Sequence, residues 1–302
     1  NILIVFDTSG SMGDTVDTGN YYNPATTYPT HPDHPDIVAT RVYVKPASGD
    51  WFNPLTVFKN SIAEVECSTA RSTLTTKGLY TGRTNYDCTR TSRTLATGNY
   101  LNFYLACDGL VGYAKKTDIA KNVIKDFLDT ITDVRIGLMR FGSRAKDGSW
   151  DSDEGGSMVY NIQDLTDSNR KAIKDAVDSL PASGWTPLAE VFVEAGRYFA
   201  GTVSYFNYSG GKNIAYSSPI QYYCQRNYVI LMTDGISTQD RNSILQLIGN
   251  KGDVDGDLRE PPGALNDPGF TDNGSDYLDD VVKYCYDTDL NGDRIGTQNI
   301  TT

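Results

Sequence analysis

Residues 2–11 read ILIVFDTSGS, and this stretch decides the fold. Its five consecutive apolar residues predict a strand that is buried on both faces, as strands of parallel sheets are. Asp7, Ser9 and Ser11 follow directly, so one carboxylate and two hydroxyls stand at alternate positions of a loop. Alternate residues of an extended turn point the same way. Because all three donors are oxygens, the loop suits a hard divalent cation such as Mg²⁺, Mn²⁺ or Ca²⁺ better than Zn²⁺.

The composition indicates an acidic globular protein. The chain has 302 residues and 39% hydrophobic content, enough for one large domain with insertions or for two small domains. Its 38 acidic and 27 basic residues give a formal charge of −11 without a long block of one sign, which argues against a nucleic-acid partner. No stretch approaches the roughly 18 consecutive apolar residues of a membrane span, so no transmembrane segment is expected. The chain opens on a strand without a leader, and we expect a cut or processed start.

The cysteine pattern favours disulfides over zinc. The five cysteines are far apart and form no CxxC pair, which argues against structural zinc and for an oxidising compartment. Cys224 precedes a predicted strand and Cys285 ends a predicted helix, so we expect a bridge between them that ties an insertion to the sheet. Cys67, Cys88 and Cys107 allow three alternative pairings, and the odd count leaves one thiol free or bonded outside the chain.

Strands and helices alternate along the chain. Strands are predicted over 2–6, 134–141, 158–162 and 228–232, and helices over 114–131, 168–180, 187–199 and 277–286. Thr186-Pro187 is a helix start signal, with threonine as the N-cap and proline at the first helical position. The alternation predicts an α/β fold with a central, mainly parallel sheet that is flanked by helices.

Three polar segments without periodicity are expected to be insertions: 14–112, 201–226 and 238–275. The first is too long for a connecting loop, so it is predicted to be structured. The chain stops at Thr302, where an α/β fold would begin another strand. We therefore expect the C-terminal strands to lie outside this chain, and residues 228–232 to form an exposed apolar edge unless another strand covers it.

The strand ends bring together a set of oxygen donors. In open parallel sheets ligands bind at the carboxyl ends of the strands. Asp7, Ser9 and Ser11 leave the first strand, Asp234 leaves the strand at 228–232, and Thr186 stands at a helix start. Two aspartates neutralise a divalent ion, and the hydroxyls leave it able to accept a partner's carboxylate. The simpler alternatives are a hydrogen-bonded turn at Asp7 and Ser9 and a plain N-cap at Thr186.

This set resembles the metal-ion-dependent adhesion site (MIDAS) of von Willebrand factor A (vWA) domains. The signature of that site is Asp-x-Ser-x-Ser, a distant Thr and a distant Asp, and its counterparts here are in the same order, with FDTSGSM at 6–12 and LMTDG at 231–235 as the specific parts. The resemblance implies a Rossmann-like domain that binds proteins through a metal ion, Mg²⁺ or alternatively Mn²⁺ or Ca²⁺.

A narrower resemblance is to the PilY family of adhesins at the tips of bacterial type IV pili. It is carried by ATGNYLN at 96–102, WTPLAE at 185–190, SPI at 218–220 ahead of CQ at 224–225, and QNITT at 298–302. The resemblance implies an extracellular or outer-membrane-associated protein that supports pilus assembly, adhesion and surface sensing. The implied partners are minor pilins, a host or surface ligand, and the β-propeller that follows the vWA region in this family; no part of that propeller is in this chain.

Two features leave alternatives open. A simple vWA domain runs straight from its Ser-x-Ser loop into the first helix, whereas here the insertion 14–112 intervenes; it could roof the metal or could itself be the binding surface. Asp253, Asp255 and Asp257 alternate on a loop with Gly256, which predicts either a second site, for Ca²⁺, or a solvated acidic loop.

The leading hypothesis is a binding protein and not an enzyme. The main rival is a hydrolase with Asp7, Ser9 or Ser11 as nucleophile. Against it, an aspartyl phosphatase motif needs a second acid where Ser9 stands, and the sequence contains no G-x-S-x-G elbow. A third possibility is a structural component of the pilus tip whose metal only stabilises loops.

Overall fold

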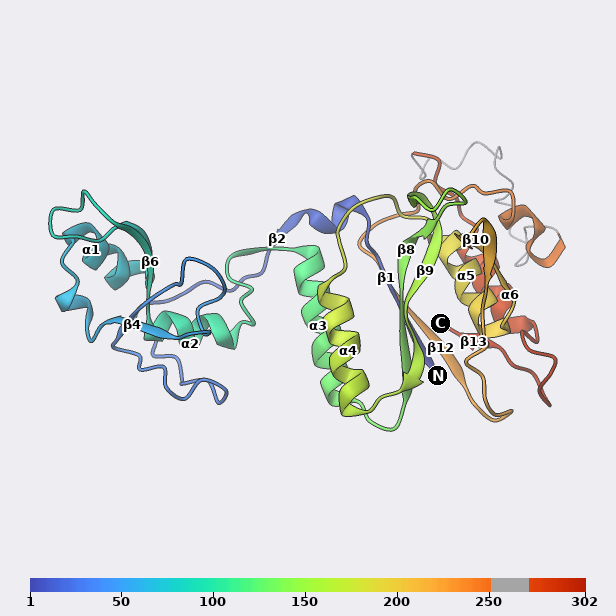
Figure 1. The fold of residues 1–302 in the computed structure, drawn as a ribbon, viewed down its shortest axis with the longest axis horizontal. Coiled ribbons are helices and arrows are strands. Elements are labelled where there is room, and N and C mark those ends of the chain that lie inside the picture. The colour runs from blue at the N-terminus through green and yellow to red at the C-terminus, as the bar shows by residue number, and fades with distance from the viewer. Residues whose placement is uncertain (251–271) are drawn as a thin grey trace. The chain divides into compact units, whose positions relative to one another are not determined.

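A five-stranded, mainly parallel sheet is the framework of the larger part of the chain (Figure 1). The computed structural model describes residues 1–250 and 272–302. The strand order is β13-β12-β1-β8-β9, in which β1 (Ile2–Phe6) pairs in parallel with β12 (Asn227–Met232) and with β8 (Arg135–Arg144). β13 (Ile300–Thr301) is parallel to β12, and β9 (Trp150–Asp164) is antiparallel to β8. The predicted α/β class with a mainly parallel sheet is thus confirmed, and the arrangement is compatible with a Rossmann-like fold.

Helices cover both faces of this sheet because β1 is apolar on both. Leu3 and Val5 belong to a buried cluster with α5 (Leu188–Ala200) and α6 (Leu278–Asp287). Ile4 and Phe6 belong to a second cluster with α3 (Lys116–Thr130) and α4 (Asp167–Asp178). Successive side chains of a strand point to opposite faces, so the five apolar residues at 2–6 supply both cores at once.

The chain divides into two compact units, Asn1–Asp14 with Lys115–Thr302, and Thr15–Ala114. The second unit, which falls on the predicted insertion 14–112, holds an antiparallel sheet in the order β4-β3-β6-β5. Its strands are β3 (Val42–Val44), β4 (Thr56–Lys59), β5 (Leu79–Arg83) and β6 (Ser92–Thr97), and its helices are α1 (Ser68–Lys77) and α2 (Gly98–Ala106). β2 (Thr15–Asp17) pairs with β7 (Tyr113–Lys115) where the chain enters and leaves this segment.

The cysteines, all of which the structure describes, differ from the sequence prediction. Cys67 and Cys88 form a disulfide, one of the three pairings left open. The predicted bridge between Cys224 and Cys285 is wrong: both are free thiols, as is Cys107. The physical reason is burial, because the Cys285 sulfur is packed inside the core against Gly196 of α5, whereas Cys224 is exposed.

The other two predicted insertions are only partly irregular. Residues 201–226 contain the hairpin of β10 (Val203–Ser209) and β11 (Lys212–Ala215). The segment 238–275 contains the short helix η3 (Leu245–Asn250). The possible calcium site at Asp253, Asp255 and Asp257 lies outside the described residues. The C-terminal β13 pairs with Asn227 and Tyr228 only, and Ile230 of β12 remains 41% exposed.

The start of α5 differs from the sequence prediction. We expected Thr186 to cap this helix, but the helix begins at Leu188 and no side chain caps it at the preceding position. Asp240 does so from a distant loop: its carboxylate accepts hydrogen bonds from the backbone nitrogens of Ala189 (2.9 Å) and Glu190 (3.0 Å). A buried carboxylate at a helix N-terminus pairs the otherwise unsatisfied N–H groups and interacts favourably with the helix dipole.

A second buried carboxyl group lies next to Asp240. Glu190 is 1% exposed and accepts hydrogen bonds from the backbone nitrogens of Gly155 (2.9 Å) and Asn242 (3.0 Å). Burial, and then the neighbouring charge of Asp240, raises the pKa of Glu190 to about 9. Glu190 thus ties β9 to α5 through its bond from Gly155.

This raised pKa predicts how stability depends on pH. A carboxyl group whose pKa is higher in the folded state favours folding most below its ordinary pKa of 4.5, and that contribution is lost as the pH rises towards about 9. We expect the free energy of unfolding, from urea titrations, to fall between about pH 5 and about pH 9. In Glu190→Gln, which cannot titrate, the fall should be shallower whatever the variant's absolute stability. Equal slopes in the two proteins would contradict this role of Glu190.

Candidate metal centre

The register of the two central strands brings both predicted aspartates to one edge of the sheet. Phe6 lies opposite Met232 in the parallel pairing of β1 and β12. The backbone nitrogen of Asp7 donates to the carbonyl of Met232 (3.0 Å), which extends the pairing by one residue. Asp7 and Asp234 therefore leave the carboxyl ends of adjacent strands, where parallel sheets present their ligand sites.

Four of the five predicted donors are joined by one chain of hydrogen bonds. The Asp7 carboxylate accepts from the backbone nitrogen of Ser9 (2.6 Å). The hydroxyls of Ser9 and Ser11 are 3.0 Å apart, and the Ser11 hydroxyl donates to Oδ1 of Asp234 (2.8 Å). Asp7 and Ser9 are at most 2% exposed, whereas Ser11 is exposed. The set of donors is therefore buried at Asp7 and accessible to solvent at Ser11.

The fifth predicted donor, Thr186, lies beside this loop without bonding to it. The loop's Gly10 nitrogen donates to the carbonyl of Gly184 (2.9 Å), and Ser183 donates to the carbonyl of Thr8 (2.7 Å), so the segment before Thr186 runs along the loop. Thr186 is 5% exposed, and its nitrogen is held by the hydroxyl of Thr238 (2.9 Å). None of the hydrogen bonds among the described residues joins its side chain to the other four donors.

The electrostatics of the site call for positive charge. Burial is the main cause that raises the pKa of Asp7; hydrogen bonds from Ser9 and Thr233 oppose the rise, and the charge of Asp234 adds to it. Lys116, the first residue of α3, supplies positive charge from within the protein. Its ammonium group lies 2.6 Å from Oδ2 of Asp234 and 4.0 Å from Asp14. The hydrogen bond to Asp234 is the main cause that raises the pKa of Lys116.

The donor set fits a divalent cation. Adjacent oxygens around an octahedral ion are roughly 3 Å apart when the metal–oxygen bonds are about 2.1 Å, close to the 3.0 and 2.8 Å that separate the oxygens of Ser9, Ser11 and Asp234. The two carboxylates of the set are offset by one lysine, which also pairs with Asp14, so at least one negative charge is uncompensated. The described residues contain no group of three or more His, Cys, Asp or Glu side chains placed to hold a metal; a site of this kind rests instead on two carboxylates and hydroxyls.

Sequence reasoning missed two residues of this site. The hydroxyl of Thr233 donates to Oδ2 of Asp7 (2.8 Å), and the residue stands inside the LMTDG run that predicted Asp234. Lys116 had a separate signal: a lysine in the first turn of a helix is unfavourable with respect to the helix dipole, which indicates that it has a carboxylate partner elsewhere.

Comparisons of the chain with protein-family models, with curated proteins and with solved structures gave no match. In the part of the chain that the structure describes, every helix is too short or too polar to cross a lipid bilayer.

Proposed function

We propose that the sheet-containing unit is a vWA-type domain whose MIDAS-type site holds a divalent cation and, through it, a carboxylate of a protein partner. The observation that carries the proposal is the chain of hydrogen bonds that runs from the Asp7 carboxylate to the backbone nitrogen of Ser9, and from the Ser9 hydroxyl through Ser11 to Asp234, at the ends of adjacent parallel strands. The PilY-like motifs support the further proposal of an extracellular module at the tip of a type IV pilus. Its partners would be minor pilins, the remainder of the same adhesin, or a host or surface ligand.

The residues have distinct tasks in this function. Mg²⁺, or alternatively Mn²⁺ or Ca²⁺, would supply the charge that attracts a partner's carboxylate. Asp7 and Asp234 neutralise most of that charge, and the backbone nitrogen of Ser9 and the hydroxyl of Thr233 hold Asp7 in place. Neutral Ser9 and Ser11 add donors without adding charge. The function is binding, and no catalytic step is assigned to these residues.

One observation favours an alternative in which the site only stabilises the loops. Lys116 already pairs with Asp234 at 2.6 Å, so the loops are held together by an internal cation. On that alternative the protein is a structural component of the pilus tip, and partners bind elsewhere. The two functions differ in whether partner binding requires the bound metal ion.

The first test is metal binding by the loop. We expect Mg²⁺ titrated calorimetrically into the full chain to bind, and Asp7→Ala to weaken this binding by at least about 100-fold, because a charged ligand is lost. Thr8→Val is the matched control in the same loop: the hydroxyl of Thr8 donates to the carbonyl of Phe141 (3.3 Å) and is not one of the donors. This variant should bind Mg²⁺ as the unchanged protein does.

Adhesion and pilus assembly then separate the two functions. If Asp7→Ala loses both Mg²⁺ and adhesion while Thr8→Val keeps both, the metal-bridged function is supported. If Asp7→Ala loses Mg²⁺ but pilus assembly, adhesion and partner binding are unchanged, the metal-bridged function fails and the structural alternative holds.

The second test concerns Lys116. Because its ammonium group competes with a metal ion for Asp234, we expect Lys116→Met to raise Mg²⁺ affinity about fivefold. Lys121→Met, on the same helix, is the control, because Lys121 donates to the carbonyls of Asp178 and Leu180 and not to the site. A loss of Mg²⁺ affinity in Lys116→Met would show that the lysine supports the metal site rather than competing with it.

A further inference from the structure

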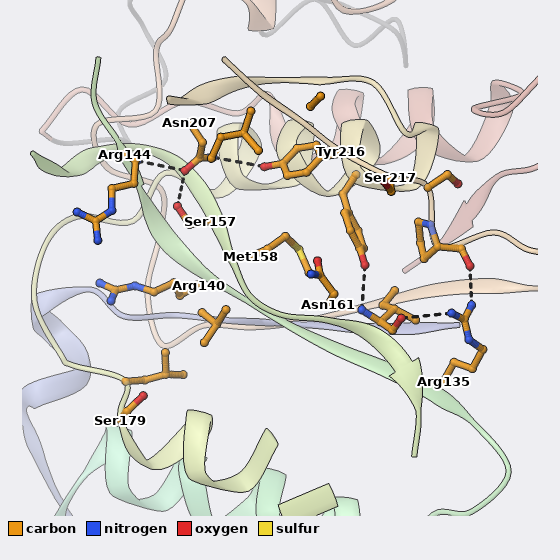
Figure 2. Close-up of a pocket in the computed structure, with 18 of the residues that line it drawn as sticks. Arg135, Arg140, Arg144, Ser157, Met158, Asn161, Ser179, Asn207, Tyr216 and Ser217 are labelled. Atoms are coloured by element: carbon orange, nitrogen blue, oxygen red, sulfur yellow. Dashed lines mark hydrogen bonds between the residues drawn. The ribbon is translucent and has the colours of Figure 1, made fainter. Parts of the chain in front are cut away.

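A cavity of about 740 Å³ lies along the outer strand of the sheet, and none of the donors described above lines it (Figure 2). Its floor is formed by β9, the edge strand of the described sheet, from Ser157 to Ile162. The β10–β11 hairpin and the end of α4 contribute its walls, through Asn207, Tyr216 and Ser179. Three arginines of β8, Arg135, Arg140 and Arg144, also line it.

Arg135 is fully engaged by the protein itself. It forms an ion pair with Asp164 (3.3 Å) and donates to the side chain of Asn1 (2.8 Å) and to the carbonyls of Pro219 (2.5 Å) and Ile162 (3.3 Å). Figure 2 shows the bonds from Arg135 to the two carbonyls at one end of the cavity. This arginine has a structural role, and its ion pair and three hydrogen bonds are the reference for the other two arginines.

Arg140 and Arg144 differ from it, because neither has a carboxylate partner among the described residues. Both guanidinium groups lie over the ring of Trp150, at 4.0 and 6.0 Å from its centre. Arg140 donates only through Nε, to the carbonyl of Phe141 (3.2 Å), and Arg144 through Nη1 to the carbonyl of Gly148 (3.2 Å). The terminal nitrogens of Arg140 remain available to the cavity.

Two like charges held against one ring repel each other. Burial, and then the charge of Arg144, lowers the pKa of Arg140. An anion placed between the two groups would relieve this repulsion, and guanidinium groups bind carboxylates through paired hydrogen bonds. In a chain with a formal charge of −11 this local surplus of positive charge is selective for acidic ligands.

The cationic end of the cavity is built on a rigid support. Oδ1 of Asn207 accepts from the backbone nitrogen of Arg144 (3.1 Å) and from the hydroxyl of Ser157 (2.5 Å). Nδ2 of the same Asn207 donates to the carbonyl of Gly156 (2.7 Å). Asn207 thus joins β8, β9 and the hairpin at the backbone of Arg144, so this end of the groove is formed before any ligand arrives.

The shape of the cavity favours an extended occupant. Arg135 and Arg144 are nine residues apart on one strand, a span of roughly 30 Å, so the cavity is a groove along the sheet edge. Side chains satisfy β9 at the two ends of the groove: Asn207 at Gly156, and the hydroxyl of Tyr198 at the nitrogen of Ile162 (2.8 Å). Between them residues 157–161 form the floor. An edge strand is a template for an added strand.

We propose that this groove binds an extended acidic peptide segment of a partner protein, which lies along β9 with a glutamate or aspartate carboxylate held by Arg140 and Arg144. An acidic sugar is the less favoured occupant, since sugars pack on aromatic faces and Arg140 already lies over one face of the Trp150 ring. The groove requires no metal, so its test is independent of the adhesion site.

The test uses two capped seven-residue peptides of alternating threonine and valine, one with a central glutamate and one with a central glutamine. Binding to the full chain is measured by calorimetry at low salt with a chelator present. We expect the glutamate peptide to bind about tenfold more tightly than the glutamine peptide, and Arg140→Gln and Arg144→Gln each to lose about tenfold in affinity for it. Arg90→Gln, which removes the same charge from the other unit, should bind the glutamate peptide unchanged.

A second measurement locates the peptide. Amide signals of residues 157–161 should shift and become protected from hydrogen exchange when the glutamate peptide binds. Arg144 is exposed, so Arg144→Gln keeps the test valid if Arg140→Gln fails to fold. Equal binding of the two peptides, binding that survives both substitutions, protection confined to other strands, or binding of free glucuronate but not of the glutamate peptide would each overturn the proposal.

Discussion

The parallel pairing of β1 with β12 is the constraint on which the rest of the site depends. It places Phe6 opposite Met232, so the next residues of both strands emerge together and bring Asp7 close to Asp234. Two carboxylates at the edge of a buried sheet are unfavourable without positive charge. These carboxylates are stabilised by the neighbouring hydrogen-bond donors and by the lysine at the start of α3. The proposed cation would stabilise them in the same way.

Lys116 allows the charge of Asp234 to be compensated by the protein's own ammonium group. The lysine lies at the end of α3 where the helix dipole disfavours a cation, and its ion pair with Asp234 offsets that cost. The proposed divalent ion would compete with this ammonium group for the same carboxylate. The site is therefore held together without metal, and the proposed metal exchanges one compensating charge for another instead of organising a disordered loop.

The metal loop and the arginine groove are joined through one backbone group. The carbonyl of Phe141 accepts hydrogen bonds from the hydroxyl of Thr8, in the metal loop, and from Nε of Arg140, in the groove. The same end of the sheet thus presents a site of negative charge next to one of positive charge.

The residues alone predicted the α/β class, the helices α3 to α6, the strands β1, β8 and β12 with part of β9, and four polar residues that the structure joins by hydrogen bonds, because buried strands and amphipathic helices leave local patterns that need no knowledge of distant contacts. Only the tertiary structure decided which groups meet across the chain. The cap of α5 came from Asp240 and not from Thr186, Cys285 was buried away from Cys224, and Lys116 reached Asp234 from 118 residues away. These contacts depend on strand register and helix placement, which no short stretch of sequence specifies. For the same reason only the structure shows that Arg140 and Arg144 have no carboxylate partner among the described residues.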